Sequence, residues 1–132
     1  MTVRFFDTQD QSNPFNGQVV QDHLQLLKIL EGCDGRAPFF AELVEEDGHK
    51  LLIGLGGAVG CVQFGSANGR PPYLMALAAD QNIGREAAEF LCGGTATPVS
   101  IRYILPFEDI ERIVIEFLQT GQRSSRISWE EI

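Results

Sequence analysis

The sequence predicts an α+β fold, in which an antiparallel meander of about six strands carries an N-terminal and a C-terminal helix on one face. Helical periodicity occurs in two segments near the ends of the chain, and short apolar runs separated by turn residues fill the middle. The 132 residues are enough to bury one core, so we expect a single domain spanning residues 1–132. Residues 1–17 are rich in polar and turn-forming residues, and irregular structure is expected among them.

The N-terminal part of the chain predicts a short strand and then a helix. Thr2 to Asp7 is the predicted strand. From Val19 to Leu30 most apolar residues share one side of a helix, which Gly32 is expected to end, and Ile29 is the one apolar residue off that side. His23 lies on the apolar side with no second His or Cys at metal-ligand spacing, so we interpret it as a packing residue.

The next segment predicts a hairpin. Pro38 to Glu46 has the pattern of a strand, and Asp47-Gly48 is typical of a two-residue turn. That turn would place Glu45 opposite Lys50, so that opposite charges face each other across the two strands. The same register would put five apolar side chains on one core face: Phe40, Val44, Leu51, Ile53 and Leu55.

A glycine-rich run from Gly54 to Gly60 follows. A phosphate-binding loop would need a helix directly after it, but Val59 to Phe64 has the composition of a strand. We therefore interpret Gly56-Gly57 as a second two-residue turn, with Ile53 opposite Gly60.

Apolar runs separated by turn residues predict the remaining strands. Ser66 to Pro72 is expected to be a loop, Tyr73 to Ala79 a central strand and Asp80 to Arg85 a turn. Ala87 to Leu91 and Thr97 to Leu105 would complete the sheet, with a glycine pair between them.

The segment from Pro106 to Trp129 contains the clearest helix. Pro106 suits a first helical turn, and Gly121 suits the left-handed position that ends a helix. Ile127 to Trp129 is expected to return the chain to the body and lay the indole ring against it. Six apolar side chains share one arc of the helix: Phe107, Ile110, Ile113, Val114, Phe117 and Leu118.

Composition narrows the classes of function. The formal charge of −8 and the pI of about 4.6 disfavour direct binding of nucleic acid, and they allow a basic partner. The N-terminus lacks the features of a signal peptide, and no apolar stretch is long enough to cross a membrane, so we expect a cytoplasmic protein with no membrane partner. Cys33, Cys61 and Cys92 are scattered singly, which argues against a disulfide framework.

Catalytic patterns are missing from the sequence. His23 and His49 are the only histidines, and neither lies in a zinc or deaminase pattern. Cys92 is interpreted as a strand-end residue rather than a nucleophile, and Glu108 and Asp109 suit the positive end of a helix dipole. We therefore expect no catalytic residue, no metal site, no cofactor and no enzymatic activity.

Several stretches together resemble the first-numbered immunity protein family of bacterial polymorphic toxin systems. They are Lys50 to Ala58, Gly69 to Leu77, Ala88 to Gly94, and Leu105 to Gly121 followed by Ser128-Trp129. The resemblance covers roughly Phe39 to Glu131, and the most telling residues are Pro106, Phe117, Thr120, Gly121 and Trp129. We interpret these five signature residues as scaffold.

The resemblance implies an antitoxin that binds a cognate toxin domain and blocks it without catalysis. It also implies a toxin of the nucleic-acid or nucleotide deaminase type, because members of the family are often encoded beside such domains. An acidic inhibitor can occupy the basic cleft of such a toxin and gain association rate through steering. The predicted partner-binding residues form a hairpin group and a second group: Glu42, Glu45, Glu46 and Asp47, and then Asp80, Glu86 and Glu89.

Two other functions remain open at the level of the sequence. One is a small-ligand or nucleotide-binding domain, or an enzyme, that uses the loops around Gly56-Gly57 and Gly93-Gly94. The other is a homo-oligomeric structural domain whose exposed sheet face or edge is covered by its own copy.

Overall fold

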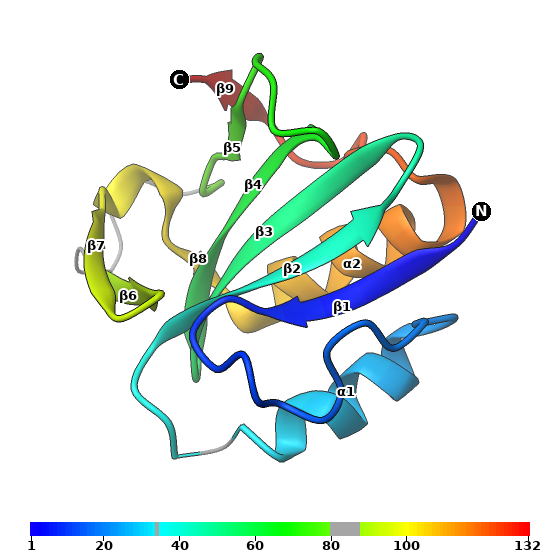
Figure 1. Cartoon of the computed structure of the whole chain (residues 1–132). Helices are drawn as coiled ribbons and strands as arrows, with labels where there is room; N and C mark the ends of the chain where they lie inside the picture. The colour runs from blue at the N-terminus through cyan, green and yellow to red at the C-terminus, as the bar shows by residue number, and fades with distance from the viewer. Residues whose placement is uncertain (34, 80–87) are drawn as a thin grey trace.

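The computed structural model describes residues 1–33, 35–79 and 88–132, and these residues build a large curled sheet with two helices (Figure 1). The predicted turn from Asp80 to Arg85 and the candidate residues Asp80 and Glu86 lie outside the described residues. The elements in chain order are β1 (Val3–Asp7), α1 (His23–Glu31), β2 (Phe39–Glu45), β3 (His49–Gly56), β4 (Val59–Ser66), β5 (Leu74–Ala76), β6 (Ala88–Cys92), β7 (Thr95–Val99), the 3₁₀ helix η1 (Ile101–Tyr103), β8 (Leu105–Pro106), α2 (Phe107–Thr120) and β9 (Trp129–Glu131).

In the part of the chain that the structure describes, the sheet has nine strands and is mixed, so the predicted antiparallel meander of about six strands is wrong. The strand order is β7-β6-β2-β3-β4-β5-β9, with β1 also paired to β2 and β8 to β4. β6 runs parallel to β2 through the pair Phe39–Leu91. It fits there because β1 pairs only with Ala41 to Glu45 and leaves the start of β2 free.

Both helices cover one face of the sheet, as predicted, and Figure 1 shows α2 passing behind β2 and β3. Their buried side chains join those of the central strands in one core. α1 contributes Leu26 and Ile29, and α2 contributes Ile110, Ile113, Val114 and Phe117.

The helix α1 begins four residues later than the predicted start at Val19. Asp22 caps the helix, because its carboxylate accepts a hydrogen bond from the Gln25 backbone N–H at 2.9 Å. The residues before it run beside β1 instead, where the Val20 N–H donates to the Val3 carbonyl at 2.8 Å.

The late start changes which side of α1 is buried. Ile29, the apolar residue that fell off the predicted side, is only 2 % exposed, whereas Leu24 on the predicted side is 60 % exposed. Val19 and Val20 are not part of the helix. Its buried residues, Leu26 and Ile29, are three positions apart, which is the spacing of side chains on one helix face.

The β2–β3 hairpin differs from the prediction by one residue in register. Val44, not Glu45, lies opposite Lys50, because the turn closes through a hydrogen bond from the Gly48 N–H to the Glu45 carbonyl at 3.0 Å and leaves a three-residue loop. A slip of one residue reverses the face of every side chain on a strand. Phe40 and Val44 therefore leave the predicted core face of β2, which carries Phe39, Ala41 and Leu43 instead.

The β3–β4 turn is shifted as well, but the faces are preserved. The loop residues are Gly57-Ala58, and Ile53 lies opposite Val62 rather than Gly60. A shift of two residues keeps the same side chains on the core face. Gly60 lets α2 approach closely, because an added Cβ there would press on the Gly54 carbonyl and lie 2.7 Å from Cδ1 of Ile110.

The β6–β7 hairpin and η1 cover part of the opposite face of the sheet. Phe90 of β6 packs on Phe40 with 5.4 Å between ring centroids, in a second buried cluster. The glycine pair turns the hairpin as expected, but the predicted strand from Thr97 to Leu105 is wrong. It breaks after Val99, where Ser100 caps η1 by accepting from the Arg102 N–H at 3.4 Å.

The C-terminal segment matches its prediction. α2 runs from Phe107 to Thr120 and ends at Gly121, which has φ +71° and donates its N–H to the Phe117 carbonyl at 2.8 Å. Trp129 starts β9, which pairs with β5. No helix within the described ranges is both long and apolar enough to cross a membrane.

Candidate interaction surface

The four predicted acidic residues of the first hairpin are divided between the two faces of the sheet. Glu42 points away from the helices and pairs with Lys50 at 2.9 Å. Glu45 lies on the helix side, where its carboxylate would be 2.7 Å from a Cβ added at Gly121. This separation follows from the alternation of side chains along a strand.

Two of the predicted acids meet at the hairpin tip. Glu46 and Asp47 are both exposed, and Glu46 lies 3.5 Å from the Nε atom of Arg4. Glu89, from the second predicted group, is exposed on β6 opposite Pro98. Of the seven predicted partner-binding residues, Glu46 and Asp47 are thus the clearest exposed pair among those the structure describes.

The signature residues around the end of α2 all have structural contacts. Phe117 is fully buried, and the Thr120 hydroxyl donates to the Glu116 carbonyl at 2.8 Å. Trp129 packs on Phe64 with 6.1 Å between ring centroids, and its indole N–H donates to the Ser124 carbonyl at 3.0 Å. These contacts fix the chain as it leaves the helix.

Among the residues that the structure describes, the β6–β7 hairpin and η1 cover part of the face away from the helices, and the rest of this face is open. One row of paired positions crosses it from β1 to β9: Phe6, Glu42, Leu52, Gln63, Met75 and Glu130. The next row begins with Arg4, Val44 and Lys50. We call these two rows the open sheet face.

A hollow of about 320 Å³ lies where the open sheet face passes under the hairpin. Its lining is mostly apolar and includes Leu52, Gln63, Met75, Cys92, Pro98 and Tyr103.

Polar groups hold the far edge of this hollow together. The Tyr103 hydroxyl donates to Glu130 at 2.8 Å, and Arg102 pairs with the same carboxylate at 3.0 Å. The hydrogen bond to Glu130, and secondly burial, raise the pKa of the Tyr103 hydroxyl. Tyr103 therefore stays neutral and keeps donating at neutral pH.

The titratable side chains offer little for catalysis. Burial raises the pKa of the Cys61 thiol to about 12, so it is protonated at neutral pH and is a poor nucleophile. His49 stacks on Phe64, with 4.7 Å between ring centroids. In the ranges that the structure describes, no three His, Cys, Asp or Glu residues are grouped to hold a metal ion.

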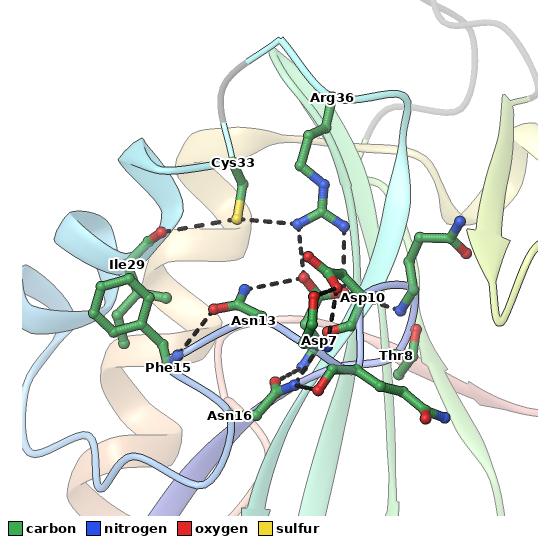
Figure 2. A network of polar contacts seen from close by, with 12 residues as sticks. Asp7, Thr8, Asp10, Asn13, Phe15, Asn16, Ile29, Cys33 and Arg36 are labelled. Atoms are coloured by element: carbon green, nitrogen blue, oxygen red, sulfur yellow. Dashed lines mark hydrogen bonds and ion pairs between the residues drawn. The ribbon is translucent and has the colours of Figure 1, made fainter.

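A buried carboxylate organises the N-terminal loop (Figure 2). The side chain of Asp7 is completely buried, and it accepts hydrogen bonds from Arg36 at 2.6 Å and from Asn13 at 3.1 Å. The backbone N–H groups of Gln9 and Asp10 also donate to it, both at 2.9 Å. Burial alone would raise the pKa of Asp7, but these hydrogen bonds together hold it below its ordinary value.

This network was not predicted from the sequence, because Asp7 and Arg36 are far apart in the chain and no motif joins them. Arg36 also lies over the ring of Phe39, 3.8 Å from its centroid. The pair therefore ties the N-terminal loop to the start of β2.

A second cleft, of about 460 Å³, lies between α1 and the β3–β4 turn. Arg36, Gly56 and Gly57 border it together with apolar side chains of α1. The Arg36 guanidinium is already bound to Asp7, which reduces its value as a ligand for an anion.

The chain is thus a small α+β protein with both helices on one face of a curled sheet and a partly apolar, hollowed opposite face. The family model described as Immunity protein Imm1 matches residues 13–131. The chain belongs to this immunity protein family, which confirms the resemblance inferred from the sequence.

The family match extends the resemblance toward the N-terminus. It begins at residue 13, so it includes α1, whereas the sequence motifs started near Phe39. Members of the family are typically non-catalytic and act by neutralising a toxin protein. No curated protein matches the chain.

Proposed function

We propose that the chain is a non-catalytic antitoxin of the cytoplasm that binds and neutralises one cognate toxin domain, of the nucleic-acid or nucleotide deaminase type. The family match over residues 13–131 carries this proposal. The charge of −8 supports a partner with a basic, substrate-binding cleft, because opposite potentials speed encounter and oppose wrong partners.

Protection in cells is the first prediction. A toxin domain encoded by the adjacent gene should stop the growth of a bacterial host, and co-expression of this chain should restore growth. The two proteins should also co-purify as a complex. Growth arrest that persists despite soluble, folded chain would refute the role as an antitoxin for that domain.

The deaminase assignment has its own readout. Cells that express the toxin alone should accumulate deaminated bases in DNA, RNA or the nucleotide pool, and co-expression should prevent this. A toxin that the chain neutralises but that cuts a nucleic-acid backbone instead would overturn the deaminase part and leave the antitoxin part intact.

The alternative of nucleotide binding is favoured by one observation, the cleft beside Gly56 and Gly57. The β3–β4 turn, however, leads into a strand and not into a helix, so it lacks the usual cradle for phosphate. We predict that millimolar ATP, GTP or CTP leaves the melting temperature of the chain unchanged. A concentration-dependent rise would favour the alternative, because a ligand that binds only the folded state stabilises it.

A further inference from the structure

The two faces of the sheet are covered unequally. α1 and α2 bury one face, whereas the β6–β7 hairpin and η1 cover only part of the other. Phe6 on β1 is 37 % exposed, and Val44 and Leu52 on β2 and β3 are half-buried. The open sheet face therefore presents apolar side chains from three adjacent strands to solvent.

The hollow next to Leu52 gives this face a shape that can anchor a partner. Its volume of about 320 Å³ is enough for one or two large side chains, and Leu52, Pro98 and Met75 line it. Interface residues that contribute most to affinity are typically large side chains seated in such recesses and shielded from water.

The charges of the open sheet face define what the partner must carry. The apolar centre, made of Phe6, Val44 and Leu52, includes one ion pair, Lys50 with Glu42 at 2.9 Å, so a partner that covers it meets a neutralised pair and no lone cation. At the margin, Glu46 and Asp47 form an exposed acidic tip that Arg4 only partly offsets. An apolar centre with a charged rim is the usual composition of a protein interface.

The geometry points to the open sheet face as the surface that binds the toxin. Its occupant is a toxin segment that inserts an apolar side chain beside Leu52 and places a lysine or arginine against Glu46 and Asp47. This inference rests on the proposed function. A second copy of the chain is a poorer occupant, because each copy carries a net charge of −8 and the copies repel one another.

Leu52→Glu tests the apolar centre, and Leu24→Glu is the matched control. Leu24 is 60 % exposed on α1, so the control makes the same change on the helix side of the molecule. Binding is measured by calorimetry against a catalytically inactive variant of the toxin domain encoded by the adjacent gene. Leu52→Glu should weaken binding about 30-fold or more, and Leu24→Glu less than about threefold.

Asp47→Lys tests the acidic rim without disturbing the core, because Asp47 is exposed at a turn. It should slow association on the order of tenfold at low salt, and the difference should shrink at high salt. Phe6→Glu replaces Leu52→Glu as the test of the apolar centre if circular dichroism shows that Leu52→Glu is unfolded.

The outcomes distinguish an error in the proposed surface from an error in the proposed function. Wild-type chain that does not bind the toxin domain would refute the function itself. Wild-type binding that survives both Leu52→Glu and Phe6→Glu, or that is lost in Leu24→Glu, would overturn the surface only. A wild-type dimer that Leu52→Glu converts to a monomer while toxin binding is unchanged would also overturn it, in favour of a second copy.

Discussion

Trp129→Ala is expected to lower the free energy of unfolding by about 3 kcal/mol, and to abolish protection through unfolding rather than through a lost contact with the toxin. The ring packs on Phe64, and its N–H donates to the Ser124 carbonyl at 3.0 Å. The ring is only half-buried, which places the effect at the low end of the range for a buried tryptophan. Urea denaturation followed by circular dichroism measures the change, because Trp129 is the only tryptophan and its variants lack its fluorescence.

Trp129→Phe is the control for this prediction. It keeps most of the packing on Phe64 and removes the indole N–H, so its cost should be about 1 kcal/mol. Protection in cells should follow stability across the two variants. A Trp129→Ala protein with normal stability and no affinity for the toxin would instead place the interface at the end of α2.

Asp7→Asn is expected to cost about 2–4 kcal/mol at pH 7, because it leaves the guanidinium of Arg36 without its buried counter-ion. The Arg36 side chain is 27 % exposed, so water compensates part of the loss. Asp10→Asn is the matched control in the same loop. Asp10 is exposed, and its replacement should cost about 0.5 kcal/mol or less.

The cost of Asp7→Asn should depend on pH. Hydrogen bonds lower the pKa of Asp7 in the folded state below its ordinary value of 3.8, so its contribution is fully present above that value. The contribution is lost as the pH falls through the lowered pKa of the folded state. The difference in unfolding free energy between wild type and Asp7→Asn should therefore shrink below about pH 3.8. A difference that is constant from pH 7 to pH 2 would contradict the assignment.

Local signals in the sequence were enough to predict α2 and the two-helix layer. The start of α2 is marked by Pro106 and its end by Gly121. Both signals act within the helix itself, so tertiary contacts did not change the predicted bounds. The sequence also contains a signal for the start of α1, the N-cap residue Asp22 three residues before Gln25. The prediction placed the start earlier because Val19 and Val20 fit the apolar periodicity of the helix.

The register of the first hairpin could not be settled from its turn residues. Asp47-Gly48 suits a two-residue turn, yet the loop has three residues, and this one-residue difference exchanges Phe40 and Val44 with Phe39 and Leu43 on the core face. The parallel contact between β6 and β2 was equally hidden, because it depends on where β1 stops.

The composition of the candidate surface also depends on strand register, which the sequence alone did not determine. The acidic hairpin residues were visible in the sequence, but the strand pairing decides that Glu42 and Glu45 lie on opposite faces. Phe6 and Leu52 come to lie on either side of Glu42 only in the correct register. The family could be inferred from short motifs, because the scaffold residues that carry them lie close together along the chain.

Stoichiometry tests most directly the central claim that the chain neutralises its toxin by binding and not by catalysis. A fixed amount of the toxin domain encoded by the adjacent gene is titrated with the chain, and the remaining toxin activity is measured after equilibration. Neutralisation by binding predicts a linear loss of activity that reaches zero at one chain per toxin domain. Complete inactivation by a small fraction of that amount, or no inhibition by an excess of folded chain, would contradict the claim.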